Sequence, residues 1–135
     1  MIWKYEGTEY NGKAISIDDW AILGEQVKGH LLDDLKYQKD DITRMGNQAS
    51  IQMRDYDMFD VLRYSARKDV RYDIIRMIFK NDKRVDDKLI SSFINETEFL
   101  EYYRKVLESS GVSFVKEKAE DEINPPQSEQ SAEPT

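Results

Sequence analysis

Residues 47–110 read NQASIQMRDYDMFDVLRYSARKDVRYDIIRMIFKNDKRVDDKLISSFINETEFLEYYRKVLESS and contain neither glycine nor proline. These are the two residue types that interrupt helices most strongly. A long, strongly charged stretch that lacks both therefore indicates a small helical body. We predict a mainly α-helical domain of four or five helices in residues 1–115 of the 135-residue chain.

Hydrophobic residues in this stretch recur every three or four positions, which is the spacing of one helix face. They are Phe59, Leu62, Ala66, Val70, Ile74, Met77 and Ile78. Because the average helix has about 11–12 residues, we favour two helices joined near Lys68–Asp69 over a single one. Asp86 or Asp87 should begin the next helix and Asn95 the last, which should end at Gly111.

The N-terminal residues predict a short β-hairpin. Trp3 and Tyr5 alternate with charged residues, as in a strand with one buried face. Either Glu6–Gly7 or Asn11–Gly12 supplies the turn, and Asn–Gly is the stronger turn signal. Two strands alone are marginally stable, so we expect the hairpin to lean on a helix.

Ser16, followed three residues later by Asp19, indicates a capping box at the start of a helix. The apolar residues of one helix face follow, namely Ile17, Trp20, Leu23, Val27, Leu31 and Leu35. We expect this helix to end near Lys39, and its two glycines, Gly24 and Gly29, either bend it or let another backbone approach.

Two segments show no helical pattern. Within residues 40–53, Gly46-Asn47-Gln48 suggests a turn, and residues 49–53 suggest either a short strand or a loop. Residues 116–135 carry two lysines against six acidic residues and contain all three prolines. Such a composition cannot bury enough apolar surface to offset its ordering entropy, so we predict a disordered acidic tail.

Composition limits the classes of protein that this chain can represent. It contains no cysteine, so disulfides and thiolate metal sites are impossible. No apolar run has the length of a signal peptide or of a membrane span. We therefore expect a cytoplasmic protein that does not enter a membrane.

Positive charge gathers in residues 63–84, which hold eight basic and three acidic residues in a chain of net charge −7. Six side chains of this segment are the candidate partner-binding residues: Arg63, Tyr64, Arg67, Lys68, Arg71 and Tyr72. On a continuous helix the three arginines would form a ladder along one face, able to pair with Asp60 or with an acidic partner. Because the chain is acidic overall, we do not expect nucleic acid as a partner. The uneven charge would also permit self-association into a homo-oligomer.

No residue pattern indicates catalysis, a metal or a cofactor. His30 lies near Asp33 and Asp34 at helical spacing, but one imidazole and two exposed carboxylates make a poor metal site. The acids at 55, 57 and 60 lack the glycine turn of a calcium loop and are better read as helix-capping residues. We therefore predict a non-enzymatic protein-binding or assembly factor.

The segments Tyr5-Glu6-Gly7-Thr8-Glu9-Tyr10 and Ile15-Ser16-Ile17-Asp18-Asp19-Trp20 resemble the start of tail assembly chaperones of long-tailed bacteriophages. Those proteins open with a short hairpin and a capped helix, continue as a small helical domain and end in an acidic, proline-containing tail. The resemblance implies a protein that self-associates in the host cytoplasm and binds the tape-measure protein. It implies no catalysis and carries over no site residue.

Two other functions stay open. The chain could be an acidic inhibitor or regulator of a host nucleic-acid-binding protein, to which it would present carboxylates. It could also be a small nucleic-acid-associated protein that uses the basic 63–84 stretch.

Overall fold

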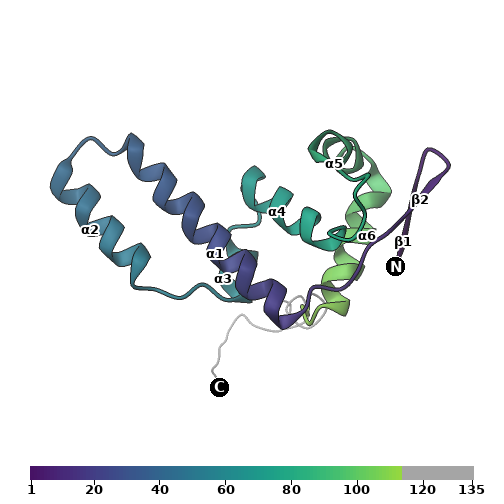
Figure 1. Cartoon of the computed structure of the whole chain (residues 1–135), viewed down its shortest axis with the longest axis horizontal. Helices are drawn as coiled ribbons and strands as arrows, with labels where there is room; N and C mark the ends of the chain where they lie inside the picture. Colours follow the sequence, from purple (N-terminus) through teal and green to yellow (C-terminus); the bar gives the residue numbers. More distant parts are fainter. Residues whose placement is uncertain (114–135) are drawn as a thin grey trace, which may run out of the picture.

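The computed structural model describes residues 1–113 (Figure 1). Strands β1 (Ile2–Tyr5) and β2 (Thr8–Asn11) form an antiparallel hairpin. The helices of the described residues are α1 (Ile17–Asp34), α2 (Asp41–Gln52), α3 (Met58–Arg63), α4 (Lys68–Ile78), α5 (Asp87–Ile94) and α6 (Thr97–Ser109), with a 3₁₀ turn at Leu35–Tyr37 after α1. The predicted mainly helical fold with an N-terminal hairpin is confirmed. The predicted tail, residues 116–135, lies outside the described residues.

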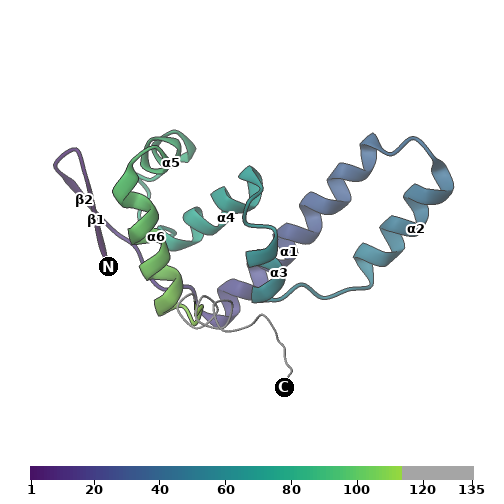
Figure 2. The same ribbon diagram turned by 180° about the vertical axis from the view of Figure 1, so that it is seen from behind.

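Helix α1 connects two parts of the molecule (Figures 1 and 2). Helix α1 packs against α3 and α4, and His30 and Asp34 in its second half contact residues of α4 and its N-cap. Helices α5 and α6 and the hairpin lie at one end of the molecule, while α2 runs back beside α1 at the other end. We call residues 28–53, the second half of α1 together with α2, the arm.

The hairpin turns at Glu6–Gly7, where both residues have positive φ, 49° and 80°. Two consecutive positive φ angles are the signature of a type I′ turn, which matches the twist of the flanking strands. The alternative turn at Asn11–Gly12 is not used. Gly12 serves close packing instead, since a Cβ there would lie 2.1 Å from the hydroxyl oxygen of Tyr102.

An aromatic cluster joins the hairpin to the helices. Trp3 and Tyr10 lie opposite each other in the hairpin and are both buried. The ring of Phe93 is 5.9 Å from that of Trp3, 5.2 Å from Tyr10, 5.7 Å from Phe79 and 5.5 Å from Phe99, between centroids. Tilted and edge-on aromatic contacts at such distances add to the energy of apolar burial. The hairpin is therefore stabilised by α4, α5 and α6, as a two-stranded element requires.

The two ends of the described chain also meet through Ser110. Its hydroxyl accepts a hydrogen bond from the Ile15 backbone N–H at 2.7 Å, and its carbonyl oxygen accepts one from Trp20 Nε1 at 3.3 Å. The end of α6 is thereby tied to the entry of α1.

Most predicted helix boundaries are confirmed. Ser16 and Asp19 form a capping box, and Asp86 caps α5. At the end of α6, Gly111 has φ 102°, and the N–H groups of Gly111 and Val112 donate to the carbonyls of Glu108 and Leu107, as in a Schellman motif. The prediction that Asn95 begins α6 was wrong, because Asn95 ends α5 and Glu96 is the N-cap residue of α6.

The stretch from 55 to 80 forms two helices, as favoured, and they are separated by residues 64–67. The Ser65 hydroxyl donates to the Leu62 carbonyl oxygen at 2.6 Å, which satisfies the end of α3. Arg67 then adopts an extended backbone, with φ −69° and ψ 139°, and acts as the N-cap residue of α4. The chain changes direction at this point without a glycine or a proline.

Residues 41–52 form a helix, which corrects the predicted turn at 46–48 and the strand or loop at 49–53. The Asp40 carboxylate accepts a hydrogen bond from the Thr43 backbone N–H at 2.8 Å and caps this helix. Hydrogen bonds from Thr43 also lower the pKa of Asp40. A helix tolerates Gly46 because an interior glycine costs only about 1 kcal/mol relative to alanine.

Candidate functional site

The six candidate residues lie on three different parts of the surface. Arg63 and Tyr64 end α3, Arg67 precedes α4, and Lys68, Arg71 and Tyr72 lie on α4. The predicted arginine ladder was wrong, because the break at residues 64–67 removes the continuous helix on which it depends. The structure brings Arg67, Lys68 and Tyr72 together beside one groove and places Arg71 at another.

Arg67 joins α4 to the end of α1. Its guanidinium group donates to the Asp34 carboxylate at 2.6 and 3.4 Å and to the Asp69 carboxylate at 3.0 and 2.8 Å. These two acids raise the pKa of Arg67, and the Arg67 guanidinium lowers that of Asp69. Arg67 is thus occupied within the molecule.

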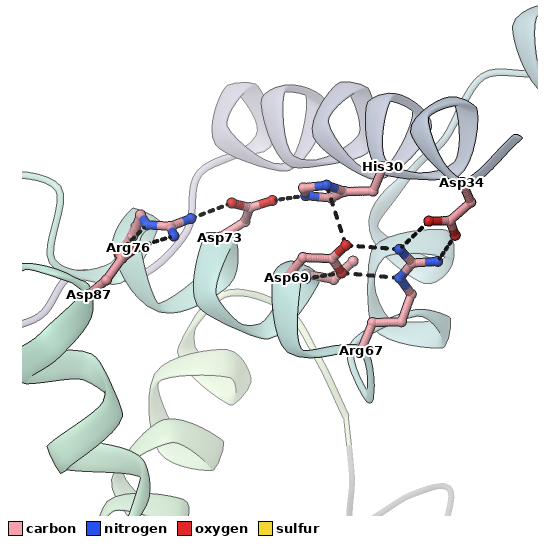
Figure 3. Close-up of polar contacts among 8 residues, drawn as sticks. His30, Asp34, Arg67, Asp69, Asp73, Arg76 and Asp87 are labelled. Atoms are coloured by element: carbon pink, nitrogen blue, oxygen red, sulfur yellow. Dashed lines mark hydrogen bonds and ion pairs between the residues drawn. The ribbon is translucent and has the colours of Figure 1, made fainter. Parts of the chain in front are cut away.

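His30 extends these ion pairs along α4 (Figure 3). Its Nε2 donates to the Asp73 carboxylate at 2.6 Å, and its Nδ1 lies 3.4 Å from Asp69 Oδ2. Asp73 also accepts a hydrogen bond from Arg76 at 2.6 Å, and Arg76 contacts both oxygens of Asp87 at 2.7 and 2.8 Å. We call this set the charged network: His30, Asp34, Arg67, Asp69, Asp73, Arg76 and Asp87.

Sequence reasoning missed the role of His30, because its partners are forty residues away on another helix. Asp33 and Asp34, the acids near it in sequence, do not contact the imidazole in the described structure. Within residues 1–113 no three histidine or acidic side chains are arranged to hold a metal ion. The network fixes the base of the arm to α4, since its members on α1 are bound by side chains of α4 and its N-cap residue.

Most basic side chains of residues 63–84 form ion pairs within the described part of the chain. Arg63, Arg67, Arg76, Lys80 and Arg84 each lie within 4.0 Å of a carboxylate oxygen. Lys68, Arg71 and Lys83 have no such partner within residues 1–113. A partner with negative charge would therefore meet three scattered cations instead of a basic stripe.

Two hollows adjoin α4. An open groove of about 770 Å³ is lined by Arg67, Lys68, Asp69, Tyr72, Arg76, Asp87, Lys88 and Ser91. Lys68 Nζ lies 5.6 Å above the Tyr72 ring, which is cation–π geometry. A smaller hollow of about 310 Å³ is lined by Arg71, Ile75, Ile94, Phe99, Leu100 and Tyr103, and burial raises the pKa of Tyr103 to about 12. Neither hollow gathers side chains in an arrangement typical of a reaction.

Helix α2 carries a row of exposed apolar side chains. Ile42, Met45, Ala49 and Met53 follow one another at spacings of three or four, so they form one stripe along the helix. The side chains of Ile42, Met45 and Met53 are 82%, 66% and 86% exposed, and Ala49 is also exposed. We call these four residues the α2 stripe.

The opposite face of α2 lies toward the rest of the molecule. Arg44 donates to the Gln38 carbonyl oxygen at 3.2 Å, and Lys28 of α1 donates to that of Gln52 at 3.4 Å. Ile51 is half-buried and packs against the hydrophobic core. The α2 stripe therefore points away from the other elements of residues 1–113. Its spacing was visible in the sequence, but the glycine at position 46 directed the interpretation toward a turn.

No helix of residues 1–113 is long and apolar enough to cross a membrane. Comparisons with protein-family models, curated proteins and solved structures found no match for this chain. The function is therefore inferred from the geometry of these surfaces.

Proposed function

We propose that this chain is a non-enzymatic protein-binding or assembly factor that binds its partner through the α2 stripe. The observation that carries this function is the orientation of α2, which turns Ile42, Met45 and Met53 outward while Arg44 and Ile51 lie on its opposite face. Contiguous exposed apolar surface commonly marks an interaction site. Apolar anchors at spacings of three and four also suit a helix that lies in a hydrophobic groove of a partner.

The charged network supports this function by fixing the arm. His30 and Asp34 lie on the part of α1 that belongs to the arm, and Arg67, Asp69 and Asp73 bind them. An interaction surface on a rigid element loses less entropy on binding than one on a mobile element. The arm therefore presents the α2 stripe in a defined direction.

The N-terminal resemblance gives a specific candidate partner, the tape-measure protein of a long-tailed bacteriophage. The α2 stripe would then lie against a long helical partner, and the arm would hold the body away from it. Co-expression with a candidate tape-measure protein, followed by purification, tests this identity separately from the binding function.

The two other functions receive less support. An acidic inhibitor would present unpaired carboxylates. Seven aspartates of residues 1–113 instead pair with basic side chains, namely Asp19, Asp34, Asp60, Asp69, Asp73, Asp82 and Asp87, while others such as Asp18, Asp33 and Asp55 have no ion pair there. A nucleic-acid-binding protein would offer a continuous basic surface, whereas five of the eight basic residues in 63–84 are paired.

The test is site-specific photo-crosslinking in cells that express the native partner. A photoreactive amino acid replaces Met45 on the stripe or, as the control, the exposed Asn47 on the same helix. A covalent adduct with a defined protein that forms from position 45 and not from position 47 is the expected result. Equal or absent adducts from the two positions would contradict the proposed function.

A further inference from the structure

We infer that His30 is a proton-dependent latch, which fixes the arm against α4 while both ring nitrogens carry a proton and loosens it when one proton is lost. As a control over how the arm presents the α2 stripe, the latch rests on the proposed function. Three features favour it: the two carboxylates that face the imidazole, the charge of the network and the glycine that precedes His30.

Each ring nitrogen of His30 faces a carboxylate (Figure 3). Nε2 donates to Asp73 at 2.6 Å, and Nδ1 lies 3.4 Å from Asp69 Oδ2. A neutral imidazole carries one N–H group, so it can donate to only one of two carboxylates, which are themselves acceptors. Its other nitrogen would then turn a lone pair toward a negative oxygen. The imidazolium form carries N–H groups on both nitrogens and suits Asp69 and Asp73 together.

The charge of the network favours the same protonated form. Its acids outnumber its arginines by four to two, namely Asp34, Asp69, Asp73 and Asp87 against Arg67 and Arg76. A proton on His30 therefore reduces an excess of negative charge. The Asp73 side chain is only 11% exposed, so solvent screens its charge less than that of a surface carboxylate. Lys68 lies over the Tyr72 ring and pairs with none of these acids within residues 1–113.

The other helices that pack against α1 add no ionisable partner to His30. Within residues 1–113, α2 and α3 give the imidazole neither a hydrogen bond nor an ion pair. Asp33 and Asp34, on its own helix, form no ion pair with the ring either. Arg67 and Arg76 face the carboxylates that bind His30 and keep their charge at every relevant pH. The protonation of the imidazole is thus the one variable of the latch near neutral pH.

His30 is the only histidine of the chain. Histidine is the side chain that ordinarily changes its charge between about pH 5 and 8. On the acid side of this range the charged ring bridges both carboxylates and the latch is closed. As pH rises, the ring becomes neutral, one carboxylate loses its donor and the latch loosens.

Gly29 gives α1 a point at which the arm can bend. It directly precedes His30, a Cβ added there would meet nothing within 4 Å, and glycine is a poor helix former. Val27, on the other side of Gly29, is buried in the core. Arg67 still binds Asp34 when His30 is neutral. We therefore expect the open arm to sample more orientations without separating from the body.

Two spin labels measure this change in the full chain. The chain has no cysteine, so Asn47→Cys on α2 and Glu98→Cys on α6 label exposed positions of the arm and of the body. Double electron–electron resonance should give one main distance at about pH 5.5. At about pH 8 the population outside that peak should rise about two- to fivefold, as for the loss of a partly exposed ion pair. Identical distributions at the two pH values would overturn the inference.

A matched pair of variants assigns the response to the imidazole. His30→Gln keeps a hydrogen-bonding side chain that cannot gain a charge, so its distribution should be broad at both pH values. Asp33→Asn changes an exposed acid on the same helix and should respond to pH like the labelled parent chain. A His30→Gln chain that still responds to pH would contradict the inference. If that variant fails to fold, the parent chain at the two pH values decides.

The protonation of the ring can be observed directly, because a single histidine gives a single pair of ring nitrogen signals. In the chain labelled with ¹⁵N-histidine, both nitrogens should carry a proton at about pH 5.5 and one should carry it at about pH 8. A ring with one proton at both pH values would also overturn the inference.

The latch and the proposed function fail in different ways. If the arm responds to pH but position 45 forms no protein adduct, the latch holds and the protein-binding function is wrong. If position 45 forms the adduct while the arm gives one distribution at both pH values, the function holds and the latch is wrong.

Discussion

Gly24 of α1 lies directly against the backbone of Tyr56. A Cβ at position 24 would come within 2.0 Å of the Tyr56 carbonyl oxygen and within 2.9 Å of its carbonyl carbon. The glycine therefore sets how closely α1 approaches the segment that leads into α3. Because the opposing atoms belong to the backbone, no side-chain rotation can make room for a larger residue.

Gly24→Ala should lower the free energy of unfolding by about 1–3 kcal/mol, the usual cost of overpacking, despite the higher helix propensity of alanine. Gly29 is the matched control, since it lies on the same helix and a Cβ added there would meet nothing within 4 Å. Gly29→Ala should raise the free energy of unfolding by about 0.5–1 kcal/mol. Urea unfolding followed by circular dichroism measures both, and equal effects of the two substitutions would contradict the close approach.

Asp19 should make stability depend on pH in the acid range. Lys80 Nζ contacts both Asp19 carboxylate oxygens at 2.9 Å, and this contact, with the Ser16 hydrogen bonds, lowers the pKa of the buried carboxyl. Its contribution is fully present above the unfolded-state pKa, about 3.9, and is lost as pH falls through the lower folded-state value. Asp19→Asn should therefore reduce stability at neutral pH and flatten the acid limb of the stability curve. Asp33→Asn, at an exposed position on the same helix, should do neither.

Tyr102 should make stability depend on pH in the alkaline range. Burial raises its pKa to about 12, and its hydroxyl donates to the Met1 carbonyl oxygen at 2.7 Å. In the unfolded chain the Tyr102 hydroxyl ionises near pH 10. The contribution of the buried, neutral side chain to the free energy of unfolding is therefore fully present below that pH and is lost as pH rises toward 12. Tyr102→Phe should reduce this fall. The control is Tyr37→Phe, which removes a hydroxyl from a side chain that is 74% exposed; an identical alkaline limb in both variants would contradict the prediction.

His30 and Asp73 should be energetically coupled. The contact at 2.6 Å joins α1 to α4, and the Asp73 side chain is largely buried. A double-mutant cycle with His30→Ala and Asp73→Ala should give a coupling energy of roughly 0.5–3 kcal/mol. The exposed pair Lys4–Glu9, at 3.8 Å, should give about 0–1 kcal/mol in the same experiment. Coupling at His30 no larger than that of the surface pair would mean that the network does not hold the arm.

The basic residues of α4 should not support nucleic-acid binding. Arg67 is engaged by two carboxylates, while Arg71 has no carboxylate partner within residues 1–113. We expect no gel shift with single-stranded or duplex DNA at low salt. A shift whose salt slope falls by about one when Arg71 is replaced by alanine would revive the nucleic-acid-associated function.

Local signals predicted the parts of the fold that depend on a few neighbouring residues. The Ser16–Asp19 capping box, the Asp86 cap and the Gly111 terminus are hydrogen-bonded within three to five residues, so their sequence pattern determines them. The hairpin was also predicted, although the turn uses Glu6–Gly7 because the aromatic cluster fixes which residues of the strands must pair.

Longer-range relationships were not predictable in the same way. The apolar stripe expected from Phe59 onward requires a single continuous helix. The break at residues 64–67 divides this stretch into α3 and α4, so the spacing of residues before the break does not carry over to those after it. Phe59 is consequently 65% exposed, while Val61 is fully buried. The charged network was missed for a related reason: its contacts join α1 to α4, and only the tertiary arrangement brings His30 to Asp73.

The order in which the chain is made has a consequence for Trp3. Its ring lies 5.0 Å from that of Phe99 and 5.6 Å from that of Tyr102, between centroids, on a helix near the other end of the described chain. During translation Trp3 cannot be covered by these rings until residues 99–102 have left the ribosome. Contacts this distant in sequence form slowly, so the nascent chain carries an exposed tryptophan until α6 is available to cover it.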